Sequence, residues 1–173
     1  MAKIAFSKLC LTKDKIDEVQ TTKFNGQEIE VKQYLPISEK ADLITRVLNN
    51  SIDESVGYYN NLKIDMWLGL EIVYAYSNIN FTEKQKSDPM KLYDLLNSNK
   101  LLNIIVGLIP ESEFYYLNRV THDLATAIYT YRNSALGIIE SIGRDYSSLD
   151  FDATEIQKKL ADPNNLALLK DVV

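Results

Sequence analysis

The chain has 173 residues, a length that fits one domain or one domain with an appended hairpin. Hydrophobic residues make up 46% of it, which is enough for a packed core and too many for a disordered chain. The net charge is −5 and the basic residues are scattered, so the composition argues against nucleic-acid binding through phosphates.

An Asn25-Gly26 pair near the N-terminus predicts a β-hairpin, because both central residues of such a turn need positive φ. Strand-like runs flank the pair, at Thr22–Phe24 and Glu28–Tyr34. Side chains alternate along a strand, so one face of the hairpin should be covered. The residues expected on that face are Ile29, Val31 and Gln33. An isolated hairpin is marginal in water, so this one must pack on helices or pair with a strand of another subunit.

Two helices are predicted after the hairpin. Ser38 can cap a helix that runs to about Asn50. The apolar stripe of this helix comprises Leu43, Ile44, Val47 and Leu48. A loop over Ser51–Asn61 then leads to a second helix, from about Leu62 to Tyr76. This helix is apolar almost all round, which is typical of a helix in the centre of a packed domain.

Asp88-Pro89 predicts the capped start of a short helix that reaches about Asn97. The residues that it should bury are Met90, Tyr93 and Leu96. Another helix covers Leu101–Leu108, and Pro110 then begins the longest predicted helix, which runs to about Tyr146.

Apolar residues along this long helix are spaced alternately by four and three, a heptad-type seam that indicates packing along its length. The seam comprises Leu117, Thr121, Leu124, Ile128, Tyr131, Ala135, Ile138 and Ile142. Downstream, Asp152 and Glu155 predict the capping box of a further helix. The elements together predict a mainly α fold, a helical bundle around one long central helix with an N-terminal β-hairpin. Residues 1–37 would form the N-terminal segment and hairpin and residues 38–173 the helical domain, within one folding unit.

The sequence contains no recognisable catalytic constellation. His122 is the single histidine, and its neighbour Asp123 points in a different direction on a helix. Glu71, inside the apolar second helix, should pair with a buried Arg or Lys or lie at a subunit boundary. A C-terminal acidic cluster lacks the spacing and the glycine of a calcium loop. Its members are Asp145, Asp150, Asp152 and Glu155. We therefore predict a protein that is not an enzyme and has no cofactor and no metal.

One cysteine, Cys10, excludes an intramolecular disulfide, and with one histidine it excludes an ordinary zinc site. We expect Cys10 to be a buried, inert thiol. The first ten residues lack the apolar core of a signal peptide, and the longest apolar run, Leu101–Ile109, is about half of a bilayer span. These features predict an intracellular protein without membrane contact.

Eleven tyrosines are the most unusual feature of the composition. Tyrosine suits a surface that is apolar but must also hydrogen-bond, although many of the eleven could instead line the core. Tyr58 and Tyr59, on the predicted loop, are the best interface candidates, and one of Tyr115 and Tyr116 must face outward. The predicted interface residues are Phe24, Asn25, Gly26, Ile29, Val31, Tyr58, Tyr59, Tyr115 and Tyr116.

Four stretches carry a family resemblance that extends over most of the chain. They are Ile29–Pro36, Leu70–Lys86, Lys91–Leu96 and Asn165–Lys170. In these stretches the chain resembles a group of small proteins encoded by tailed phages of Gram-positive bacteria. The resemblance implies a role in virion morphogenesis, as a structural component of the head, the neck (the head–tail connector) or the tail, or as a tail-assembly chaperone. It implies no catalytic residues.

The leading hypothesis is therefore a phage structural or assembly protein that acts through protein interfaces. Its partners would be other phage structural proteins or copies of itself, in an oligomer or a larger particle, with no nucleic acid and no membrane. It would be located in the host cytoplasm during assembly, and in the virion if it stays there. The alternative is a host-directed inhibitor such as an anti-defence protein, for which a net charge of −5 is mild if the inhibitor mimics nucleic acid.

Overall fold

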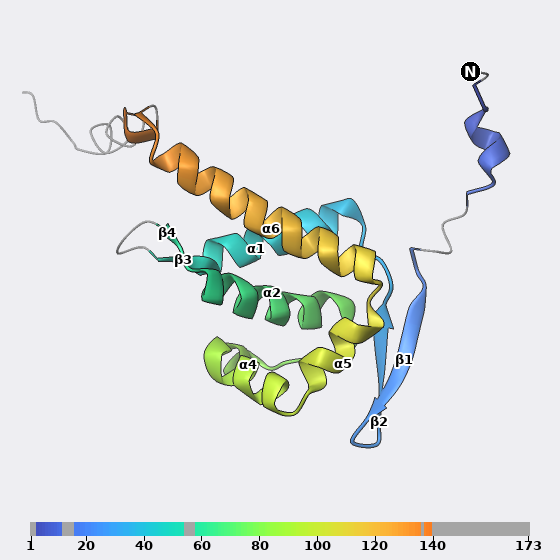
Figure 1. The fold of residues 1–173 in the computed structure, drawn as a ribbon. Coiled ribbons are helices and arrows are strands. Elements are labelled where there is room, and N and C mark those ends of the chain that lie inside the picture. Colours follow the sequence, from blue (N-terminus) through green and yellow to red (C-terminus); the bar gives the residue numbers. More distant parts are fainter. Residues whose placement is uncertain (1–2, 12–15, 54–57, 136, 140–173) are drawn as a thin grey trace, which may run out of the picture. The chain divides into compact units, whose positions relative to one another are not determined.

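The computed structural model describes residues 3–11, 16–53, 58–135 and 137–139. These residues are mainly helical with an N-terminal antiparallel β-hairpin, which confirms the predicted fold class (Figure 1). The chain divides into two compact units, Met1–Tyr129 and Thr130–Val173, and the hairpin belongs to the first. The C-terminal acidic cluster and the capping box predicted at Asp152 lie outside the described residues. None of the described helices is long and apolar enough to cross a membrane.

The hairpin consists of β1 (Val19–Phe24) and β2 (Gln27–Lys32), joined by the predicted two-residue turn. Asn25 has a φ of 50° and Gly26 a φ of 81°, the left-handed conformation that this turn requires. As predicted, the covered face carries buried side chains. They are Ile29, Val31 and Gln33. A short 3-10 turn, η1 (Phe6–Leu9), lies upstream of the hairpin.

Helix α1 spans Ile37–Ser51 and buries the predicted apolar stripe. The predicted cap at Ser38 is wrong, because the helix already begins after Pro36. The Lys40 amide donates to the Pro36 carbonyl over 3.0 Å, and no side chain caps the first turn. Proline can begin a helix because its fixed φ is already close to the helical value.

The region predicted as a loop after α1 contains two short antiparallel strands, β3 (Ile52–Asp53) and β4 (Tyr58–Tyr59). They are too short for a sequence pattern to indicate them. Helix α2 (Asn61–Tyr76) follows, and the Asn60 side chain caps it by accepting from the amides of Leu62 and Lys63.

Helix α2 packs on α1 and, on its other side, on α4 (Pro89–Ser98) and α5 (Leu101–Leu108) (Figure 1). Its buried residues point in several directions, as its all-round apolar sequence predicts. Gly69 faces α4 and α5, because a Cβ at this position would lie 3.1 Å from Tyr93 Cε2 and 3.2 Å from Leu102 Cδ2. The glycine therefore permits the close approach of these helices.

Between α2 and α4 lies α3 (Glu83–Lys86), which begins at a capping box formed by Thr82 and Gln85. In α4 the Asp88 side chain accepts from the Lys91 amide and Pro89 occupies the first turn, as predicted. The expected burial of Met90 is wrong, because this side chain is 60% exposed. Leu96 is buried and Tyr93 is half-buried, as predicted, and Leu92, one turn before Leu96, is buried as well.

Helix α6 (Glu111–Arg132) is the longest described helix and ends well before the predicted boundary at Tyr146. A turn follows at Asn133-Ser134, where the Ser134 hydroxyl accepts from the Gly137 amide over 3.1 Å. Asparagine and serine side chains compete for backbone hydrogen bonds in this way, which explains the early end.

The heptad seam is confirmed only in part, because Ile128 is half-buried against the core as predicted and Ile142 lies outside the described residues. Leu117 and Thr121 are buried, but Leu124 and Tyr131 are 42% and 45% exposed. The buried stripe follows a spacing of four instead. It comprises Glu113, Leu117, Thr121 and Ala125. Such a stripe suits a helix that lies at an angle to its neighbours rather than running along them, and α6 is inclined to α1 and α2 in Figure 1.

Candidate interaction surface

The outer edge of β1 is the most open backbone surface of the hairpin. The Gln33 amide donates to the Glu18 carbonyl over 2.9 Å, so even-numbered residues of β1 bond to β2. The N–H and C=O groups of the odd-numbered residues point the other way. These residues are Val19, Thr21 and Lys23. No strand in the described part of the chain pairs with this edge.

The outer edge of β2 is different, because the chain after α2 covers it. Asn78 donates from its amide to the Glu30 carbonyl over 3.2 Å and accepts from the Glu30 amide through Oδ1 over 3.1 Å. Val31 also forms a bridge with Ser77. The hairpin is thus anchored to the helices through β2, and in Figure 1 β1 lies on the side of β2 away from the helices.

Two of the predicted interface residues belong to the core. Ile29 is 5% exposed and Val31 is fully buried, so neither can contact a partner. The alternation that revealed them indicates only a covered face, and the helices of the same chain cover it. Phe24 is half-buried against the core, whereas Asn25 and Gly26 are exposed at the turn.

Of the two adjacent tyrosines in α6, one faces outward, as predicted. Tyr115 is 64% exposed, and Tyr116 is half-buried with its ring centroid 5.4 Å from Lys40 Nζ. The backbone of Tyr58 lies in β4, and its side chain is outside the described residues.

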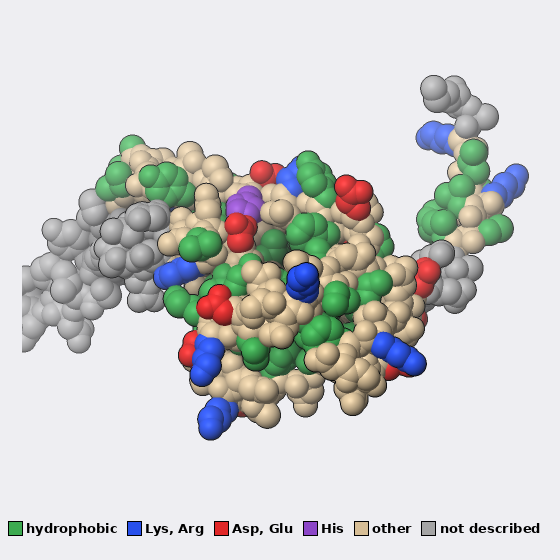
Figure 2. Space-filling view, turned by 60° about the horizontal axis from the view of Figure 1, so that its bottom comes forward, with side chains coloured by type: hydrophobic (Ala, Val, Ile, Leu, Met, Phe, Trp, Pro, Cys, Tyr) green, Lys and Arg blue, Asp and Glu red, His purple; other side chains and the backbone are tan. Residues whose placement is uncertain are grey.

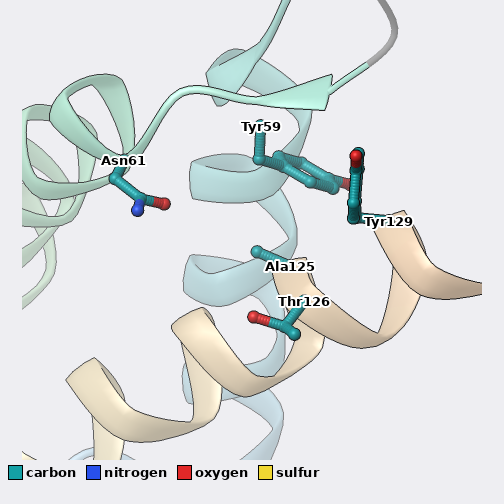
Figure 3. Close-up of a pocket in the computed structure, with 5 residues that line it drawn as sticks. All are labelled: Tyr59, Asn61, Ala125, Thr126 and Tyr129. Carbon is teal, nitrogen blue, oxygen red and sulfur yellow. The ribbon is translucent and has the colours of Figure 1, made fainter.

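Tyr59 lines a pocket of about 380 Å³ between β4, the start of α2 and α6. Tyr59 and Tyr129 point toward one another across it, with Thr126 and Ala125 on α6 below them (Figure 3). The lining combines apolar ring faces with hydroxyl groups and the amide of Asn61, a mixture that suits a polypeptide side chain. Of the predicted loop tyrosines, Tyr59 therefore has the surroundings of an interface residue.

The segment before the hairpin exposes apolar side chains. Ile4, Phe6, Leu9 and Leu11 are all at least half exposed, and η1 has no buried residue. Cys10 is exposed as well, so the expectation of a buried thiol is wrong. An apolar run indicates burial only where the rest of the fold reaches it. On the face drawn in Figure 2, basic and acidic side chains are interspersed.

A buried polar cluster joins the segment between β2 and α1 to α1, α2 and α6. Its centre is the carboxylate of Glu113, which forms a 2.8 Å ion pair with Lys40 Nζ. Glu113 Oε1 also accepts from the Leu35 amide over 3.1 Å and from the Tyr76 hydroxyl over 2.9 Å. Lys40 Nζ lies 3.9 Å from the ring centroid of Tyr34. Both carboxylate oxygens accept from these buried groups, which gives the cluster a structural role.

Burial, together with the hydrogen bond to Glu113, raises the pKa of Tyr76 well above its usual range. In the unfolded chain this tyrosine ionises near pH 10, whereas in the folded chain it stays protonated. We therefore expect Tyr76 to lower stability progressively above about pH 10, by up to about 1.4 kcal/mol per pH unit.

The Tyr76→Phe variant isolates this effect, because it keeps the ring and removes the titrating group. Urea unfolding of both proteins at about pH 8 and about pH 11 should show the wild type losing more stability than the variant. Equal losses in both proteins would contradict the assignment. All other groups are the same in both proteins, so their contributions cancel in the difference.

Glu71 has an ion-pair partner, as its position in α2 predicts, but this partner, Arg46, is half exposed and not buried as expected. Its side chain is 7% exposed, and Oε2 accepts from Arg46 Nε of α1 over 2.8 Å. The pair lines a pocket of about 470 Å³ with Trp67, Tyr74 and Phe81, the last two packed edge to face with ring centroids 5.3 Å apart. Burial and the nearby carboxylates of Glu71 and Glu83 raise the pKa of Tyr74.

We expect Arg46→Gln to lower the free energy of unfolding by about 1–3 kcal/mol, because the Glu71 carboxylate stays buried without its counter-ion. The side chain of Arg46 is half exposed, so water can replace part of the interaction and the loss should be smaller than for a fully buried pair.

Arg119→Gln is the matched control for this variant. Arg119 forms a 3.9 Å pair with Asp123, and both side chains are more than half exposed. Chemical denaturation should show a change of at most about 0.5 kcal/mol for the control. Equal effects of the two substitutions would mean that the Glu71 pair is no stronger than a surface pair.

His122 is partly exposed on α6, as predicted, and its Nε2 lies 3.1 Å from Oδ1 of Asp65 on α2. Its sequence neighbour Asp123 pairs with Arg119 instead. Among the described residues, no group of three or more His, Cys, Asp or Glu side chains is placed to hold a metal ion. His122 thus links two helices at the surface.

Sequence reasoning missed the outward-facing residues of β1 and the Lys40–Glu113 pair. For β1, the two-residue turn was a usable signal, because turn length fixes which residues bond to the partner strand. For Lys40, the signal was its place one turn before Leu43 and Ile44 on the apolar stripe of α1.

Comparisons with family models, curated proteins and solved structures found no match for the chain.

Proposed function

We propose that the protein is a non-enzymatic component of phage morphogenesis that acts by binding other protein subunits, in the head, the neck or the tail. The observation that carries the proposal is the open outer edge of β1. An exposed strand edge offers unpaired N–H and C=O groups, and added strands from partner chains use such edges. The phage context comes from the resemblance in four stretches, Ile29–Pro36, Leu70–Lys86, Lys91–Leu96 and Asn165–Lys170.

Protein binding is also favoured by the exposed tyrosine Tyr115 and by the Tyr59 pocket, whose lining suits a polypeptide side chain. These features lie on α6 and β4, apart from the hairpin in sequence. A subunit within a particle usually has several neighbours, so more than one contact surface is expected of it.

Mass spectrometry of particles purified from the phage that encodes the chain tests the proposal. Peptides of this chain in mature virions support a structural component, and peptides only in assembly intermediates support an assembly factor. Absence from both kinds of particle, together with capture of one specific host enzyme, would overturn the proposal in favour of a host-directed inhibitor.

A further inference from the structure

We infer that the outer edge of β1 pairs with the same edge of a second copy, antiparallel and about a two-fold axis centred on Thr21. The inference rests on the proposed function, because it names the partner of the same edge. Its product is a continuous four-stranded sheet across the dimer, which overcomes the marginal stability of a two-stranded ribbon.

The hydrogen-bonding direction of β1 fixes the register. The outward groups belong to Val19, Thr21 and Lys23, and an antiparallel pair forms only between residues that both point outward. One self-pairing register uses all three in both copies. It sets Thr21 opposite Thr21 and Val19 opposite Lys23. Each of these pairs exchanges two backbone hydrogen bonds.

The charges along β1 favour this register. Lys23 faces Val19 of the second copy, so the two lysines stay four residues apart along the strands. Asp17 lies two residues before Val19, in a bend that leads into the strand, and its side chain is exposed, so this register brings its carboxylate near the partner's lysine. If the register shifts by two residues toward the turn, Lys23 faces Thr21 of the second copy and the two lysines come closer together. A further shift by two residues sets the two lysines opposite each other, where like charges repel.

The rest of the hairpin leaves this edge available. Edge strands are commonly protected by proline, by a bulge or by a covering segment. β1 contains no proline, and its pairing with β2 is continuous from Val19 to Phe24. Lys23 is the one charged residue in the strand, and self-pairing accommodates it. A two-fold axis normal to the sheet also keeps the covered faces of both hairpins on the same side.

A cysteine at position 21 tests the register directly. In a Cys10→Ser background, which removes the single exposed thiol, Thr21→Cys places two cysteines in one cross-strand pair. Paired residues of this kind have Cα atoms about 5.5 Å apart, within the range of a disulfide. Mild oxidation should convert most of the protein into a covalent dimer. Glu30→Cys is the control, because Glu30 is exposed and pairs with Thr21 on the same face but lies one strand further from the axis.

A second variant tests the hydrogen bonds without a new thiol. The Thr21 amide points away from β2, so Thr21→Pro removes an outward donor and leaves every hairpin hydrogen bond in place. Analytical ultracentrifugation of the full chain should show a concentration-dependent dimer that the variant weakens by about tenfold or more. Circular dichroism checks that the variant keeps its helices.

A wild-type chain that stays monomeric through the micromolar range would overturn the inference. Equal crosslinking of the Thr21 and Glu30 variants, or an undiminished dimer in the proline variant, would overturn it as well. A monomeric chain that is nevertheless found in virions would leave the proposed function standing and assign the edge to a different protein.

Discussion

Replacing Glu113 by glutamine should lower the free energy of unfolding by about 3–5 kcal/mol, because Lys40 is left as a buried cation without a counter-ion. The side chains of Lys40 and Glu113 are 6% and 9% exposed, so water does not replace the lost charge. Glutamine has nearly the same shape as glutamate, so the substitution tests charge and not packing.

Glu39→Gln is the matched control. Glu39 lies on α1 beside Lys40, and its carboxylate is 3.6 Å from Lys32 Nζ with both side chains about half exposed. Surface pairs of this kind contribute at most about 1 kcal/mol. The urea midpoint of unfolding should therefore be clearly lower for Glu113→Gln than for Glu39→Gln. The slope of the unfolding free energy against urea concentration should stay the same if both variants unfold in two states. Equal midpoints would show that the buried pair contributes no more than a surface pair.

A double-mutant cycle sharpens the result. Lys40→Met alone leaves the Glu113 carboxylate with two donors, the Leu35 amide and the Tyr76 hydroxyl. We expect it to cost less than Glu113→Gln, and the double variant to cost less than the sum of the two single variants. Additive losses would mean that the two side chains do not stabilise each other.

The hairpin and the helix order could be predicted from sequence because their signals are local. The Asn25-Gly26 turn specifies its own φ angles, and Asp88-Pro89 marks a helix start by itself. The central place of α2 followed from its composition alone, since a helix without a polar face has to be covered on all sides.

The remainder depends on tertiary contacts that no local pattern contains. The burial of Lys40 and Glu113 follows from their meeting across more than seventy residues of sequence. The heptad reading of α6 held only in part because several spacings fit one helix, and the inclination to α1 and α2 selected the spacing of four. Ile29 and Val31 were correctly placed on a covered face, but whether helices or a second subunit cover a face is not a property of the strand.

The interaction surface also depends on both local signals and tertiary contacts. The open edge of β1 could have been predicted only in part, because the turn determines which residues point outward but not whether a segment covers them. Asn78 covers the equivalent groups of β2. The chain reaches that edge only because α2 ends beside it.

Alanine at Leu70 and alanine at Ile72 should each lower the free energy of unfolding by about 2–5 kcal/mol. Both side chains are fully buried, although two successive steps of about 100° place them on nearly opposite sides of α2. Large effects at both positions are expected only of a helix covered on two sides, by α1 on one and by α4 and α5 on the other.

Leu62→Ala provides the control within the same helix, because Leu62 is 79% exposed in the first turn of α2. It should change stability by at most about 0.5 kcal/mol. Thermal and urea unfolding of the three variants would compare the stability lost on the two buried sides of α2 with that lost at its exposed first turn. A large loss at only one of the two buried positions would contradict the central placement of α2, because a surface helix has a single sensitive face.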